Sequence, residues 1–182
     1  MKKITFFVLF VSLACPAWAQ EIFVNSGATR DVKTGTTALQ WGLTYRQGLS
    51  EHTAFSFSYF NEGHQPNHYR DGFASQIWGK TSMFDPRLSF ALGVGPYAYF
   101  DTKITPVRDV YEDAHGWGII SSATATWAGL SPLLLQMRLN YINAQHSFDT
   151  LSATFGIGYQ LGAEPPAASA PNPPETIQTY DN

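Results

Sequence analysis

Residues 151–161 alternate between apolar and small or polar side chains along their whole length. Apolar or aromatic residues occupy the odd positions, whereas Ser, Thr, Gly and Gln occupy the even positions. A period of two residues is the pattern of a β-strand whose two faces meet different surroundings. The segment is therefore predicted to be a strand with one apolar face and one polar face.

The same alternation recurs upstream in five segments, at 39–46, 55–62, 88–101, 115–127 and 133–143. Two more segments, at 22–29 and 73–80, follow it less regularly. The second of these turns Trp78 toward the polar side, and a β-bulge in either segment would explain the irregularity. Counting all of them, the chain is predicted to be all-β, with eight antiparallel strands.

The connections between these segments alternate in length. Short ones lie at 47–51, 82–86 and 129–132, and longer ones, which hold most of the charge, His and Pro, lie at 32–36, 63–69, 102–114 and 144–150. Short periplasmic turns and longer external loops are typical of transmembrane up-and-down β-barrels, whose even strand number places both termini in the periplasm. A soluble antiparallel sandwich is the alternative. The barrel is favoured because the polar, glycine-rich face is almost free of large apolar groups.

Aromatic residues gather near both ends of the apolar face. Those near the loop ends are Tyr59, Phe100, Trp117 and Tyr141, and those near the turn ends are Tyr45, Phe55, Trp127 and Tyr159. Two aromatic bands with aliphatic residues between them are typical of strands that cross a bilayer. The pattern therefore predicts a barrel domain over residues 20–161.

The N-terminal residues 1–19 have the form of a secretory signal peptide. Two lysines precede an apolar run at 4–13, and a small-x-small cleavage site ends at Ala19. A lipoprotein cysteine at Cys15 is the alternative, although Pro16 follows it. Because this is the only cysteine, the mature chain is expected to have no disulfide, thiol nucleophile or cysteine metal site.

The composition agrees with an exported membrane barrel. Aromatic residues make up 15% of the chain and charged residues 14%, against about 25% charged residues in ordinary soluble domains. The formal net charge of -3 gives no support for nucleic-acid binding. No cofactor is predicted.

An eight-stranded barrel is just wide enough for side chains to fill its interior, so a broad aqueous channel is not expected. Several charged or amide side chains nevertheless have inward parity. They are Arg46, Glu62, Arg70, Lys80, Asp101, Arg138 and Asn140. Charges in so narrow a space must be paired and hydrogen-bonded, which predicts a structural network that closes the lumen.

The C-terminal residues 162–182 lose all periodicity and become rich in Pro and Ala. Such a composition predicts a disordered or extended tail. By strand parity the tail would emerge in the periplasm, where it could tether a partner.

These architectural features resemble the small outer-membrane barrels of the OmpA/OmpX class over about residues 21–161. The resemblance rests on the signal peptide, the alternating strands, the aromatic bands and the closing strand that ends at 158–161. It implies residence in the outer membrane of a Gram-negative bacterium, contact with membrane lipid and lipopolysaccharide, and insertion by the barrel-assembly machinery. A structural or surface-interaction role in the cell envelope is the function expected, although a fold does not itself assign an activity. A loop-mediated adhesin is an alternative.

The lipid A 3-O-deacylases share this scaffold and imply an alternative function, an outer-membrane lipid hydrolase. Their catalytic His and Ser lie two residues apart on a late strand that continues into Asn-Ala. Here Asn143 and Ala144 precede His146 and Ser147. The two candidate residues are adjacent, so on a strand they would point to opposite faces.

Polar residues at the loop ends allow two further candidate sites. Ser147, His115 and Asp149 share one parity on neighbouring strands and form a candidate hydrolytic triad. His64, His68 and Asp71 supply two imidazoles and a carboxylate, a familiar set of metal ligands. The alternative is that external loops are simply where a barrel keeps its polar residues.

Overall fold

A computed structural model describes residues 20–65, 68–105 and 110–161. The predicted signal peptide at 1–19 and the predicted tail at 162–182 lie outside these described residues. Within the described ranges, no helix has the length and hydropathy needed to span a membrane.

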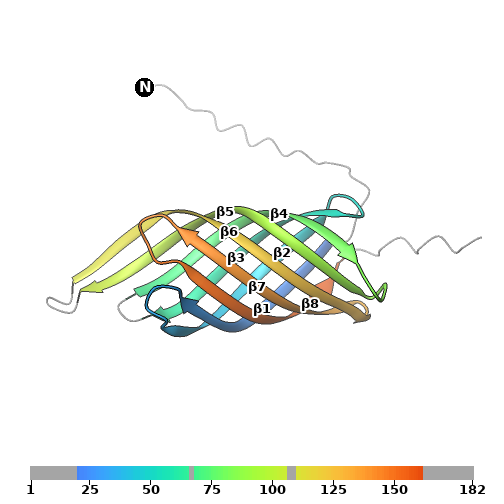
Figure 1. The fold of residues 1–182 in the computed structure, drawn as a ribbon, viewed down its shortest axis with the longest axis horizontal. Helices are drawn as coiled ribbons and strands as arrows, with labels where there is room; N and C mark the ends of the chain where they lie inside the picture. The colour runs from blue at the N-terminus through green and yellow to red at the C-terminus, as the bar shows by residue number, and fades with distance from the viewer. Residues whose placement is uncertain (1–19, 66–67, 106–109, 162–182) are drawn as a thin grey trace, which may run out of the picture.

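Eight antiparallel strands form a closed barrel in which each strand pairs with its neighbours in sequence and β1 pairs with β8 (Figure 1). The strands are β1 (Gln20–Asp31), β2 (Thr37–Gly48), β3 (Thr53–Gln65), β4 (His68–Ser82), β5 (Leu88–Thr105), β6 (Val110–Leu130), β7 (Leu133–Ala144) and β8 (Thr150–Gln160). The predicted eight-stranded up-and-down barrel is therefore confirmed.

The two faces of each strand have the predicted identities. On β8, Leu151, Phe155 and Ile157 are exposed on the outside of the barrel, whereas Ser152 and Thr154 are buried inside. The other strands repeat this arrangement. The outer surface is consequently a continuous apolar band, while the interior holds most of the polar side chains.

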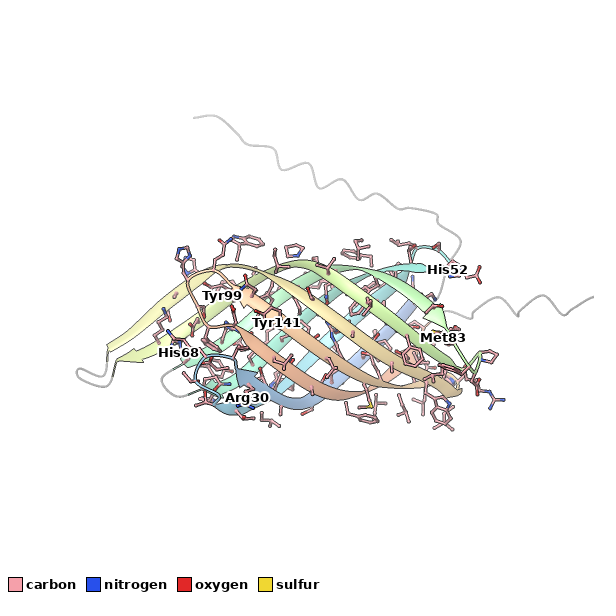
Figure 2. The ribbon with its side chains drawn as sticks, viewed as in Figure 1. Arg30, His52, His68, Met83, Tyr99 and Tyr141 are labelled. Atoms are coloured by element: carbon pink, nitrogen blue, oxygen red, sulfur yellow. The ribbon has the colours of Figure 1, made fainter. Side chains whose placement is uncertain are left out.

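Aromatic side chains stand outward near both ends of this band. Phe100, Trp117 and Tyr141 are exposed at one end, and Tyr45, Trp127 and Tyr159 at the other. The ring of Tyr59 lies between Trp41 and Phe73, with both ring centroids 5.4 Å away. Figure 2 shows Arg30 and His68 at the loop end of the barrel and His52 and Met83 at the opposite, turn end.

Two segments predicted as long loops prove to be mainly strand. The pairing of β3 with β4 continues until Gln65 meets His68, and that of β5 with β6 until Thr105 meets Val110. The predicted loops at 63–69 and 102–114 are therefore wrong. Their polar composition suggested loops, but a hairpin ladder surrounded by water needs no apolar face, only residues that tolerate extended backbone.

The side chain of Trp78 points inward, as the sequence suggested, but neither β1 nor β4 contains a bulge to explain it. Gly93 on β5 pairs with Trp78, and a Cβ atom at Gly93 would lie 2.5 Å from the indole ring. The indole nitrogen of Trp78 donates a 2.8 Å hydrogen bond to the Ser56 hydroxyl. A glycine and a hydroxyl thus accommodate the large ring in regular strand geometry.

The bulges lie elsewhere, between Asn61 and His64 on β3 and between Trp127 and Leu130 on β6. In the first bulge Gly63 has a φ of 73°, a conformation that glycine adopts without steric cost. The extra residue reverses the parity of the strand. Glu62 and Gln65 are consequently both buried, and His64 between them is exposed.

A closed barrel leaves no strand edge within the ladder to start unzipping, so it should resist SDS at room temperature. We expect the unheated protein to migrate differently on SDS gels from the boiled protein. Identical migration before and after boiling would contradict the barrel.

Candidate functional site

The middle of the lumen is occupied by Arg138 of β7, which is buried. Its guanidinium group donates hydrogen bonds of 2.6 Å each to the side-chain amide oxygens of Asn140 and Gln76. A third donor reaches the Thr44 hydroxyl at 3.1 Å. Among the described residues, no carboxylate forms an ion pair with Arg138, so neutral oxygens alone solvate this charge.

Aromatic rings complete the surroundings of Arg138. Its guanidinium carbon lies 4.9 Å from the ring centre of Phe60 and 5.2 Å from that of Trp78. These distances allow cation–π attraction, which is strongest away from water. Strands β2, β3, β4 and β7 therefore meet at this one side chain across the barrel.

Between Arg138 and the loop end, Glu62 and Arg70 form an ion pair in which both side chains are fully buried. The Nε and Nη2 atoms of Arg70 donate to the two carboxylate oxygens of Glu62 at 2.8 and 2.7 Å. The hydroxyls of Tyr97 and Thr150 donate to the same carboxylate at 2.5 and 2.6 Å. The carboxylate thus has four donors, and its charge is well compensated.

At the turn end, Arg46 pairs with Glu21, with a 2.6 Å hydrogen bond from its Nε atom. Its guanidinium group also lies 5.0 Å from the ring centre of Phe23. Three cationic layers, at Arg46, Arg138 and Arg70, therefore fill the lumen from one end toward the other. Lys80, also of inward parity, is half-buried and lines the turn-end cavities.

At the loop end, the buried carboxylate of Asp101 binds two side chains from other strands and turns. The Ser147 hydroxyl donates to Asp101 Oδ2 at 3.1 Å, and His68 Nδ1 lies 3.0 Å from the same oxygen. Arg70 donates to Ser147 at 3.1 Å, which connects this group to the ion pair below. The serine proton is therefore directed to Asp101, and no hydrogen bond joins His68 to Ser147.

The predicted triad of Ser147, His115 and Asp149 is not assembled. His115 is exposed on the outer face of β6 and makes no hydrogen bond with the described residues. Asp149 accepts hydrogen bonds from the Ala144 N–H and the Asn143 amide, so it shapes the β7–β8 turn. His146, the other candidate, has a φ of 62° at the exposed tip of this turn.

The three predicted metal ligands point in different directions. The bulge at Gly63 turns His64 outward, where its ring lies 4.6 Å from the ring of Tyr69. His68 binds Asp101, and Asp71 accepts a 2.7 Å hydrogen bond from Asn61 on the outer side of β4. Across the described part of the chain, no group of three His, Cys, Asp or Glu side chains has a geometry that would hold a metal.

A cavity of about 360 Å³ lies at the loop end, over the Asp101 group. Its lining comes from the end of β1, from the β1–β2 and β7–β8 turns, and from β3, β4 and β5. The residues are Asp31, Lys33, Thr34, Thr36, Gln65, His68, Lys103, His146, Ser147 and Phe148. The sequence did not identify Gln65 as a candidate, because regular alternation would place it outside. Only the bulge at Gly63 turns it inward.

No protein-family model matches the chain, and no curated protein sequence matches it. Solved structures do match. The N-terminal β-barrel domain of Pseudomonas aeruginosa OprF has a TM-score of 0.61 at 12% identity and covers 77% of this chain and 96% of its own. Neisserial surface protein A has a TM-score of 0.59 at 7% identity, and the match covers 78% of this chain and 96% of that protein.

The attachment invasion locus protein Ail of Yersinia pestis has a TM-score of 0.57 at 9% identity and covers 78% of this chain and 96% of its own. At such low identities these likenesses establish the fold alone. The chain has the fold of small eight-stranded outer-membrane barrels, as its resemblance to the OmpA/OmpX class implied.

Removing one partner of the buried Glu62–Arg70 pair should destabilise the barrel much more than neutralising both partners. We expect Arg70→Met to lower the free energy of unfolding by about 3–5 kcal/mol, because Glu62 keeps a buried charge without its cation. The double variant Glu62→Gln/Arg70→Met should lose less free energy of unfolding than the single variant, because no unpaired charge stays buried. Urea titration of the barrel in lipid vesicles measures both, and Glu51→Gln, in the exposed β2–β3 turn, is the control. A double variant less stable than the single variant would contradict the paired arrangement.

Proposed function

We propose that this chain, which has the fold of the small eight-stranded outer-membrane barrels, lies in the outer membrane of a Gram-negative bacterium and acts through surface contacts. In this arrangement both ends of the barrel domain face the periplasm and the loop end faces the medium. The continuous apolar band and its two aromatic borders support this placement. Insertion would require the barrel-assembly machinery, and the Pro-rich tail would be available to a periplasmic partner.

The filled lumen supports a role other than transport. Arg138 reaches from β7 to β2 and β4, and Arg70 reaches from β4 to Thr150 on β8. These contacts cross the space that a solute would need. The part of the barrel free to bind partners is therefore its loop end.

The observation that carries the proposal is the length of β5 and β6. Strand β4 pairs with β5 only as far as Lys103, and β7 pairs with β6 only from Gly118 onward. Strands β5 and β6 continue together until Thr105 meets Val110, and Figure 1 shows this hairpin projecting beyond the rest of the barrel.

The projecting part of β6 has β5 on one side and no strand on the other. An unpaired strand edge can accept hydrogen bonds from an extended segment of another protein. We therefore assign the hairpin as the contact surface of a loop-mediated adhesin. Ail, which has this fold and is named for attachment and invasion, has also been crystallised with the heparin analogue sucrose octasulfate, and this likeness supports a surface role.

A lipid hydrolase is less well supported by the geometry. The Ser147 hydroxyl donates to Asp101, and no histidine among the described residues forms a hydrogen bond with it. A serine nucleophile needs a base within hydrogen-bonding distance. Surface interaction is therefore the function that these contacts favour over hydrolysis of lipid A.

The hairpin proposal is tested by shortening β5 and β6. Replacing residues 104–111 with a two-residue Asn-Gly turn joins Lys103 to Glu112, which already pair, and removes the part of the hairpin that extends beyond β4. We expect bacteria that express the intact protein to bind epithelial monolayers and bacteria with the short hairpin to lose this binding. Heat-modifiable migration should persist in the variant.

The matched control is a replacement of residues 83–86 in the β4–β5 turn, at the opposite end of the barrel. Its adhesion should equal that of the intact protein. Undiminished adhesion by the short hairpin, or no gain in adhesion on expressing the intact protein, would refute the adhesin assignment.

A further inference from the structure

The loop-end cavity is the opening of the lumen rather than a groove on the membrane-facing side. Gln65 and His68 line it from the inward faces of β3 and β4, directly above buried Asp101. None of the exposed apolar residues of the outer band lines it. A ligand would therefore enter from the external medium, along the barrel axis, and not sideways from the membrane.

One buried donor in this cavity has no partner. Gln65 is only 6% exposed, and its amide nitrogen makes no hydrogen bond with the part of the chain that the structure describes. Its carbonyl accepts a 2.7 Å hydrogen bond from the Thr36 hydroxyl, which fixes the orientation of the amide. An unsatisfied buried donor is unfavourable, so an acceptor supplied by a ligand would be stabilising at this position.

The two acids at the cavity are already satisfied. Asp31 accepts from the backbone N–H of Lys33 at 2.7 Å and from the Thr34 hydroxyl at 2.8 Å. Asp101 is bound by Ser147 and His68. Neither carboxylate is therefore a free acceptor for a cationic ligand.

The cations at the cavity have no acidic partner among the described residues. Lys33 and Lys103 both line it, and neither forms an ion pair with a described residue. Two free ammonium groups and a free amide N–H make the cavity rich in donors. The group that complements this set is an oxyanion, which accepts several hydrogen bonds and carries negative charge.

The volume indicates more than a bare ion. Small-molecule sites in proteins have volumes of about 300–1,000 Å³, and this cavity has about 360 Å³. The Phe148 ring and the Thr34 and Thr36 side chains provide the mixed apolar and hydroxyl lining that a sugar can use. We propose that the cavity binds the phosphate or sulfate ester of a small soluble sugar, with Lys33, Lys103 and Gln65 as donors to the oxyanion.

This site does not depend on the projecting part of the β5–β6 hairpin, because Lys103 lies at the level where β4 still pairs with β5. The purified, folded full-length mature chain in detergent micelles is therefore a suitable sample for calorimetric titration. Glucose 6-phosphate, glucose 6-sulfate, inorganic phosphate and glucose are the probes, and lipopolysaccharide is titrated separately.

We expect saturable binding of at least one ester, tighter than that of inorganic phosphate and weakened by salt, and no binding of glucose. The double variant Lys33→Gln/Lys103→Gln should weaken ester binding by about tenfold or more, because it removes two charge-assisted donors. Gln65→Glu should do the same by placing a carboxylate beside the oxyanion. Lys80→Gln, at the turn end, is the matched control and should bind as the intact chain does.

Three results would overturn the proposal. The first is that neither ester binds saturably. The second is that ester binding is unchanged both in Gln65→Glu and in the double lysine variant. The third is binding of lipopolysaccharide alone, lost in the lysine variant, which would assign the cavity to a lipid phosphate. Heat-modifiable migration confirms that each variant is folded before titration.

Discussion

The buried ion pair between Glu62 and Arg70 is the interaction on which the loop-end half of the barrel depends. A closed ring of eight strands leaves an interior that side chains must fill. Here much of the filling is polar, because most of the large apolar residues face outward. Arg70 satisfies this constraint by joining β3, β4 and β8 through Glu62 and Thr150. Such a network stabilises only when every strong donor and acceptor is paired, and the four donors on Glu62 meet that condition.

The filled lumen assigns different roles to different parts of the barrel. With Arg138 solvated by Asn140, Gln76 and Thr44, the middle of the lumen is committed to structure. The free donors and the unpaired strand edge both lie at the loop end. The proposed adhesion through the hairpin and the proposed oxyanion binding in the cavity both use the loop end, which the filled core leaves available.

Much of the fold could be predicted from the sequence, because a period of two residues is a local signal that eight strands repeat. The lumen residues could be predicted for the same reason, since parity places Arg138 and Asp101 inside. Segments 63–69 and 102–114 could not, because polar residues outside the apolar band suit a strand as well as a loop. The bulge at Gly63 was equally hidden, and it alone decides that Gln65 faces in and His64 faces out. The group of Asp101, His68 and Ser147 depends on register across the barrel, which no spacing in the sequence reveals.

The network of buried side chains closes the lumen, and a measurement of ion conductance tests this closure most directly. Folded protein reconstituted in a planar lipid bilayer should show no steady open-channel current under an applied voltage, because Arg138 and the Glu62–Arg70 pair occupy the path. A stable stepwise conductance from the intact, heat-modifiable protein would contradict the account and indicate a pore.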